Sequence, residues 1–170
     1  MRFPRTGAGA IKEVSMTVKL SAKETGISAI TGKTVVVRHA NDTDLVFIEK
    51  SLKKNGLAVS DLQDFQFVVA VEDSDLIGFG GLRQTGDICD VACVVVVEKR
   101  RNRGIGATIV KHLIEYAPVD RVYVTTDLVD YFKQLGFAET NRTPRELGCV
   151  LDGECGAQGN RGTVLMVYEK

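Results

Sequence analysis

The sequence has no tryptophan, three prolines and two histidines among 170 residues. Its charges cancel, with 22 Lys plus Arg against 22 Asp plus Glu. A balanced chain has no overall field that gathers nucleic acid or an anionic membrane, so we expect neither as a partner. A length of 170 residues and a hydrophobic fraction of 44% are sufficient for the buried core of one domain.

Long apolar runs are also missing. No stretch approaches the roughly 18 continuous apolar residues that a membrane-spanning helix needs. The N-terminal residues lack the apolar segment and small-residue cleavage site of a secretory signal. We therefore expect a cytoplasmic protein.

The four cysteines do not form a metal-binding pattern. Cys89, Cys93, Cys149 and Cys155 contain no Cys-x-x-Cys pair, and no histidine lies near them in sequence. Two disulfides or a metal site are formal alternatives, but reduced thiols are the favoured interpretation for a cytosolic protein. We predict no metal ion.

The chain divides into an extension and a domain. Residues 1–33 mix Gly, Ser, Thr and Lys without sustained periodicity, which indicates a loosely ordered extension with a short strand near 17–20. The domain is expected over 34–170. We expect helices over 42–54, 104–116 and 128–135, with a short one starting near Ser60, and strands over 34–38, 67–71, 76–82, 88–97, 121–126, from about 137, and over 163–168.

The order of these elements predicts the fold class. The two strands 67–71 and 76–82 are joined by the polar turn 72–75 and should form a hairpin. Strands that come first and are then followed by alternating helices and strands indicate a mixed α/β sheet with helices on both faces.

A run of valines leads into a basic, glycine-containing turn. Val94 to Val97 suit a buried strand, and the helical spacing of apolar residues starts at Ile105. The first N–H groups of a helix lack partners within the helix and carry partial positive charge, so they can hold a phosphate. Gly104 and Gly106 keep the approach open, and Arg100, Arg101 and Arg103 add charge. A tight turn with solvated arginines is the alternative interpretation.

Three features together resemble the GNAT superfamily of acyl-CoA-dependent N-acyltransferases. The turn reads Arg101-x-x-Gly104-x-Gly106, where the superfamily has Arg/Gln-x-x-Gly-x-Gly/Ala. A second apolar strand follows at 121–126, and Tyr131 to Phe137 matches an aromatic-x-x-x-Gly-Phe signature. The resemblance is strong over 90–137, and it implies a mixed, mostly antiparallel sheet, an α+β arrangement.

The resemblance implies acetyl-CoA as the acyl donor. Its pantetheine arm would lie along the strand at Val94, Val95 and Val96, and the backbone N–H of Val96 is the candidate donor to the oxyanion. The pyrophosphate would lie on the turn, which consists of Arg101, Asn102, Arg103, Gly104, Ile105, Gly106 and Ala107.

An acidic residue is needed to take the proton of the acceptor ammonium. Asp90 lies six residues before Val96, hence on the same face of a regular strand, and the superfamily often has an acidic residue there. A structural role, such as pairing with an arginine, is the open alternative, and Asp87 is the reserve candidate. His39 and His112 are interpreted as solvated or satisfied structural residues.

The proton donor to the CoA sulfur is left open. Many superfamily members have Phe-Tyr where this chain has Tyr131-Phe132. If the helix keeps the superfamily register, Phe132 faces the thioester and no phenol reaches the sulfur. If the helix is rotated, Tyr131 is the catalytic acid.

These features predict an N-acetyltransferase that moves an acetyl group to a primary amine of a small molecule or amino acid by direct attack in a ternary complex. A non-catalytic acyl-CoA sensor and a protein or peptide N-acetyltransferase are the alternatives. Segments 55–66, 82–88 and 142–162 are expected to select the acceptor. A homodimer is compatible with the sequence.

Overall fold

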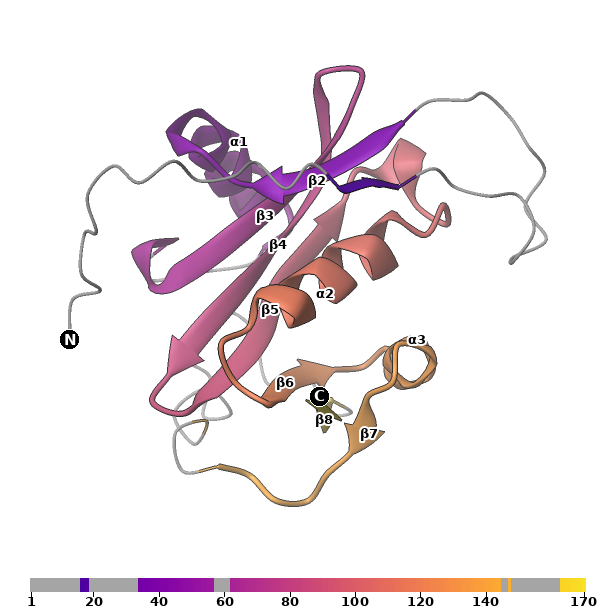
Figure 1. Cartoon of the computed structure of the whole chain (residues 1–170). Coiled ribbons are helices and arrows are strands. Elements are labelled where there is room, and N and C mark those ends of the chain that lie inside the picture. The colour runs from indigo at the N-terminus through magenta and orange to yellow at the C-terminus, as the bar shows by residue number, and fades with distance from the viewer. Residues whose placement is uncertain (1–15, 19–33, 57–61, 145–146, 148–162) are drawn as a thin grey trace.

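The computed structural model describes residues 16–18, 34–56, 62–144, 147 and 163–170. Eight strands form one sheet in the order β1-β2-β3-β4-β5-β6-β8-β7 (Figure 1). The strands are β1 (Met16–Val18), β2 (Val35–His39), β3 (Phe65–Glu72), β4 (Asp75–Thr85), β5 (Ile88–Val96), β6 (Arg121–Thr126), β7 (Ala138–Glu139) and β8 (Val164–Glu169). The helices are α1 (Asp42–Lys54), α2 (Ile105–Tyr116) and α3 (Val129–Gln134), with short 3-10 turns η1 (Leu62–Asp64) and η2 (Glu98–Arg100).

The predicted fold class is confirmed. Neighbouring strands pair antiparallel except for β5 and β6, which run parallel. The hairpin of β3 and β4 is present, and the observed elements begin and end within about two residues of most predicted ones. Strand β1 lies in the predicted extension 1–33 and pairs with β2 of the predicted domain. The rest of the extension and the segment 148–162 lie outside the described residues.

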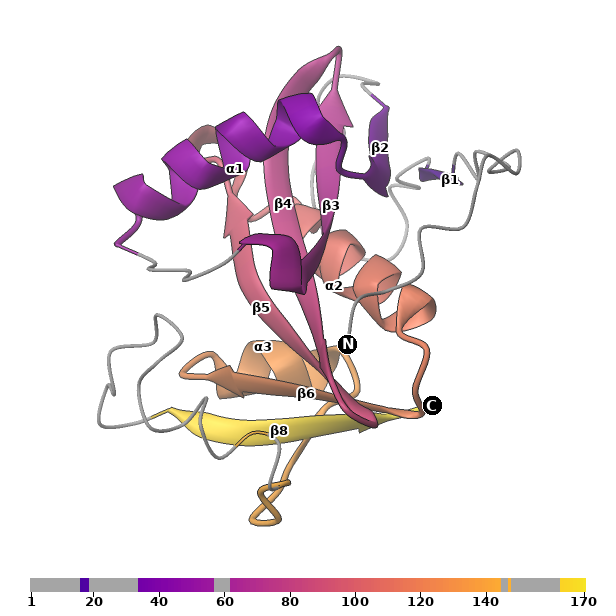
Figure 2. The same ribbon diagram turned by 90° about the vertical axis from the view of Figure 1, so that its left-hand side faces the viewer.

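Helix α1 covers one face of the sheet. Its buried side chains Ile48 and Leu52 pack against Phe67, Val69 and Phe79 of β3 and β4. Alternation along β3 sends these aromatic and branched side chains to the α1 side. Helices α1 and α2 lie on opposite sides of β3 and β4 (Figure 2).

Helix α2 covers the opposite face at close range. Ile109 and Leu113 belong to the core cluster that also contains Val68 and Ala70 of β3. A Cβ atom on Gly80 would lie 2.6 Å from Ile109 Cγ2 and 3.0 Å from Leu113 Cδ1. The glycine in β4 therefore sets how closely α2 can approach the sheet.

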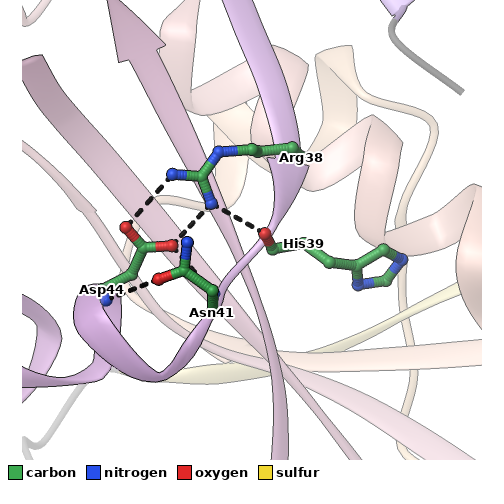
Figure 3. Close-up of polar contacts among 4 residues, drawn as sticks. All are labelled: Arg38, His39, Asn41 and Asp44. Atoms are coloured by element: carbon green, nitrogen blue, oxygen red, sulfur yellow. Dashed lines mark hydrogen bonds and ion pairs between the residues drawn. The ribbon is translucent and has the colours of Figure 1, made fainter. Parts of the chain in front are cut away.

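An ion pair between the partly exposed Arg38 and the buried Asp44 fixes the junction of β2 and α1 (Figure 3). The Asn41 side chain accepts a hydrogen bond from Asp44 N at 3.0 Å, and Asp44 Oδ2 accepts one from Asn41 N at 2.8 Å. Arg38 donates to both carboxylate oxygens of Asp44, at 2.5 and 3.2 Å, and to the carbonyl of His39 at 2.9 Å. The hydrogen bond from Arg38 is the main cause that lowers the pKa of Asp44. The first turn of α1 is thereby capped and tied to the strand before it.

We predict that Asp44→Asn lowers the free energy of unfolding at pH 7 by about 1–3 kcal/mol, because a charge-assisted bond at a helix start is lost. The folded-state pKa of Asp44 lies below its unfolded-state pKa, so the charged carboxylate stabilises the fold at neutral pH. As the pH falls through these two pKa values, the carboxylate is protonated, and the difference in unfolding free energy between the variant and the unmodified protein should shrink. Denaturant titrations at neutral and acidic pH measure both effects.

Glu49→Gln is the matched control on the same helix. It breaks the exposed pair between Glu49 and Lys53, which should matter by less than about 1 kcal/mol. A loss for Asp44→Asn that is equally small, or that stays the same at acidic pH, would contradict the assigned role of Asp44.

Candidate functional site

An extra residue in β5 determines how the site is built. Gly81 pairs with Ala92, and Phe79 pairs with Val95. Between these two pairs β5 therefore has one residue more than β4. Cys93 lies in this bulge with a left-handed backbone, φ 56°. The bulge reverses the alternation, so that Cys89 and Val91 before it and Val94 and Val96 after it all pack on the α2 side.

Beyond the bulge, β5 leaves its parallel neighbour (Figure 2). In the described residues β5 and β6 pair at Cys89 with Val122 and at Asp90 with Tyr123. Val97 N donates to Ile77 O at 2.9 Å, and alternation in an antiparallel ladder then directs the N–H and carbonyl of Val96 away from β4. Arg101 Nε donates to that carbonyl at 3.1 Å. The N–H of Val96 therefore faces the space where the two strands separate.

A cavity of about 710 Å³ occupies this space. Asn55 and Gly56 at the end of α1 line one part of it, together with Cys93 in the bulge. The start of α2 and the side of α3 line another part. Of the predicted site residues, those lining the cavity are Val94, Val96, Arg101, Asn102, Gly104, Ile105, Gly106, Ala107, Tyr131 and Phe132.

The N-terminus of α2 opens into the cavity without a side-chain cap. Gly104 has φ 75°, and no side chain of the described residues caps the N–H groups at this end of the helix. Thr108 N makes the first helical bond, to Gly104 O at 3.0 Å. The N–H groups of Ile105, Gly106 and Ala107 precede this bond, so they lack helical partners and can hold an anion.

A buried glutamate holds two arginines of the turn. Glu72 is 1% exposed, and its oxygens lie 2.8 Å from Arg100 Nε and 3.2 Å from Arg103 Nη2. Among described residues neither oxygen accepts a well-aligned hydrogen bond, so these contacts are ion pairs. The prediction that Glu72 belongs to the polar turn 72–75 is wrong. It ends β3, and no local sequence signal connects it with arginines 28 and 31 residues later.

This pairing changes the charge expected at the turn. Arg100 and Arg103 were expected to present free charge to a ligand, but one carboxylate offsets part of it. Arg103 also falls outside the described lining of the cavity, as does Val95, which packs on the α1 side. Arg100 and Arg101 do line the cavity, but part of the positive charge of the turn is used within the protein.

Asp90 lies away from the cavity, which corrects the sequence argument for it. The bulge at Cys93 reverses the alternation, so Asp90 and Val96 are on opposite faces of β5. Asp90 accepts two hydrogen bonds from Arg83, both at 3.0 Å. Burial raises the pKa of Asp90, and Arg83 opposes that shift. The alternative of an arginine pair is confirmed.

The reserve candidate Asp87 is also distant. It is exposed and lines a second cavity, of about 700 Å³, with Asp120 and Arg121 at the other end of β5 and β6. The end of the sheet at which the strands are paired therefore holds Asp87, and the end at which they separate holds the turn.

Both residues of the reversed aromatic pair line the cavity, and Tyr131 is the one that brings a hydroxyl into it. The Tyr131 hydroxyl lies beside Gly106 at the start of α2. Phe132 is 5% exposed and packs into the core, while its ring forms part of the cavity wall. Burial raises the pKa of Tyr131 above its ordinary value, so the phenol is protonated at neutral pH.

The two histidines share one aromatic cluster. His39 and His112 pack on Tyr116 with ring centroids 4.4 and 4.7 Å from it. Burial lowers the pKa of both. The cluster lies outside the described lining of the cavity.

Neither of the two described cysteines is part of a disulfide. Cys89 is buried, which raises its pKa to about 11, and Cys93 is partly exposed. Cys149 and Cys155 lie outside the described residues. The described residues contain no group of three His, Cys, Asp or Glu that could hold a metal, and no helix among them is long and apolar enough to cross a membrane.

Solved structures share this fold. Rv2747 from Mycobacterium tuberculosis, in complex with CoA and NLQ, superposes with a TM-score of 0.66 at 24% identity over 79% of this chain and 99% of that one. A GNAT family acetyltransferase from Elizabethkingia anophelis with acetyl-CoA bound gives 0.55 at 17% identity, over 80% and 98%.

N-acetylglutamate synthase from Neisseria gonorrhoeae, complexed with coenzyme A and N-acetyl-glutamate, gives a TM-score of 0.62 at 19% identity over 84% of this chain. The match spans 36% of that synthase, so this chain corresponds to about a third of it. A search of curated proteins finds no match. The family model of the acetyltransferase (GNAT) family matches residues 38–137, more than half of the sequence, and the chain belongs to that family.

Proposed function

We propose that the protein transfers an acetyl group from acetyl-CoA to a primary amine of a small molecule or amino acid, by direct attack in a ternary complex. The observation that carries the proposal is the cavity between β5 and β6, into which the uncapped start of α2, the N–H of Val96 and the Tyr131 hydroxyl all open. Complexes of CoA, acetyl-CoA and N-acetyl-glutamate with proteins of the same fold support this choice.

The pyrophosphate of acetyl-CoA binds at the start of α2. Three unpaired N–H groups, from Ile105, Gly106 and Ala107, and the positive end of the helix dipole stabilise its charge. Arg101 is tied to Val96 O, which holds the turn beside the strand end. The pantetheine arm then extends along Val94 to Val96 and hydrogen-bonds as an added strand would.

The thioester carbonyl lies at Val96. The backbone N–H of Val96 has no partner on β4, while the neighbouring residues Val95 and Val97 hold the strand to β4. The N–H of Val96 is therefore held in place and can donate to the oxyanion as the tetrahedral intermediate forms. The acceptor enters from the part of the cavity lined by Asn55, Gly56 and Cys93. Parts of the segments expected to select the acceptor, residues 57–61, 145–146 and 148–162, lie outside the described residues.

Tyr131 protonates the departing sulfur. The neutral amine first forms the C–N bond and gives the tetrahedral intermediate; when the intermediate collapses, the C–S bond breaks and the CoA thiolate takes the phenolic proton. The nitrogen releases a proton to water in the cavity, and Tyr131 is reprotonated from the same water. A site without a phenol near the sulfur would be consistent with the alternative of a non-catalytic sensor, and a tyrosine hydroxyl in the cavity supports the enzyme instead.

The proposed activity is tested with pools of amines and amino acids, acetyl-CoA and purified protein, by detection of free thiol and of acetylated product by mass spectrometry. Small-molecule product with stoichiometric thiol supports the proposal. Acetyl-CoA binding without transfer to any pool would favour the sensor, and transfer to peptides alone would favour the peptide acetyltransferase.

We predict that Tyr131→Phe lowers kcat by on the order of 10²-fold, the usual scale for a general acid, while acetyl-CoA affinity changes little. Steady-state kinetics and calorimetry measure the two quantities. Tyr116→Phe is the matched control, because it removes an exposed phenol from the far end of α2. If the two variants retain equal activity, Tyr131 is not the acid.

Asp90→Asn tests the predicted base. Because its carboxylate is held by Arg83 outside the cavity, we expect the variant to keep the acidic limb of the pH–rate profile. It should lose about 1–3 kcal/mol of stability, since the two charge-assisted hydrogen bonds from Arg83 to a buried carboxylate are weakened. Asp87→Asn, at an exposed site, should change neither quantity. Loss of the acidic limb in Asp90→Asn alone would restore Asp90 as the base.

A further inference from the structure

We propose that Gly106 is a positioning residue for Tyr131: the missing side chain at position 106 leaves the space in which the Tyr131 hydroxyl lies. The inference rests on the proposed function, in which that hydroxyl is the acid. The superfamily pattern admits Gly or Ala at this position, so the requirement for glycine would be a property of this chain and its tyrosine.

The geometry leaves no room for a methyl group beside the phenol. A Cβ atom on Gly106 would lie 2.8 Å from Tyr131 Oη and 3.8 Å from both Tyr131 Cζ and Val96 Cγ2. A carbon atom at 2.8 Å is too close, so the hydroxyl would have to move. Position 106, the phenol and Val96 thus meet at one point of the cavity.

The two glycines of the motif serve different purposes. Gly104 has φ 75°, and a Cβ on it would meet nothing within 4 Å, so its backbone conformation favours glycine there. Gly106 lies inside α2 and has no left-handed backbone. At this position the reason for glycine is space.

The Gly106→Ala variant can accommodate its new methyl group by moving the Tyr131 hydroxyl, without unfolding. The Tyr131 ring contacts Phe132 edge to face at 5.3 Å, and its hydroxyl is the free end of the side chain. Alanine is also the better helix former, by about 0.5–1 kcal/mol relative to glycine in a helix interior. The Gly106→Ala variant should therefore fold normally, but its Tyr131 hydroxyl should lie farther from the sulfur of bound acetyl-CoA.

The test is a double-mutant cycle of Gly106→Ala and Tyr131→Phe. Phenylalanine removes the atom that the new methyl group would meet, so the alanine should be harmful only while the phenol is present. We expect Gly106→Ala alone to lower kcat at saturating acetyl-CoA by about 10-fold or more, with the dissociation constant changed by less than about 3-fold. The double variant should have the kcat of Tyr131→Phe.

Two results would overturn the inference. If Gly106→Ala costs the same factor in kcat with and without the phenol, the two positions are independent. If its main effect is weaker acetyl-CoA binding, the glycine serves the pyrophosphate instead. Thermal unfolding of all four proteins checks that each is folded.

A readout without turnover separates this inference from the acid role. In protein labelled at tyrosine, the NMR resonances of the Tyr131 ring should shift in Gly106→Ala and stay in place in Lys111→Ala, an exposed substitution on the same helix. If Tyr131→Phe leaves kcat unchanged while the ring resonances do shift, the acid role fails and the positioning stands. An unshifted ring overturns the positioning.

Discussion

The site depends on one inserted residue at Cys93 in β5. The bulge sends the side chains of Val94 and Val96 toward α2 and turns β5 away from β6 after two paired residues. Because no strand among the described residues covers that side of β5 beyond the bulge, the N–H of Val96 faces a cavity rather than a neighbour. The same separation leaves room for α3 to bring Tyr131 to the start of α2. Without the bulge, the polar groups of this strand end would be used within the sheet.

The turn and the strand end are held together by contacts from distant parts of the chain. Glu72 of β3 binds Arg100 and Arg103, and Arg101 binds the carbonyl of Val96. A fully buried carboxylate is costly unless it is paired, so the position of the turn is coupled to the end of β3. The main-chain donors of α2 are thereby presented in a fixed place before a ligand arrives.

Local patterns predicted the elements, and their limits explain the errors. The spacing of Ile105, Ile109 and Leu113 identified α2, and the glycine turn before it indicated where that helix begins, because both depend on neighbours in sequence. The argument that places Asp90 and Val96 on one face failed because it assumed a regular period of two, and a single bulge reverses it. Glu72 could not be recognised, because its partners are set by tertiary packing. The order of Tyr131 and Phe132 likewise left the rotation of α3 undetermined.

The proposed mode of binding places acetyl-CoA where β5 and β6 separate, held by main-chain donors. Amide hydrogen exchange, with and without acetyl-CoA, measures the protection of these donors. We expect slower exchange at Val96 and at residues 105–107 when acetyl-CoA is bound, and unchanged exchange at 120–123 beside the second cavity. Protection at 120–123, or none at Val96 and 105–107 under saturating acetyl-CoA, would contradict this mode of binding.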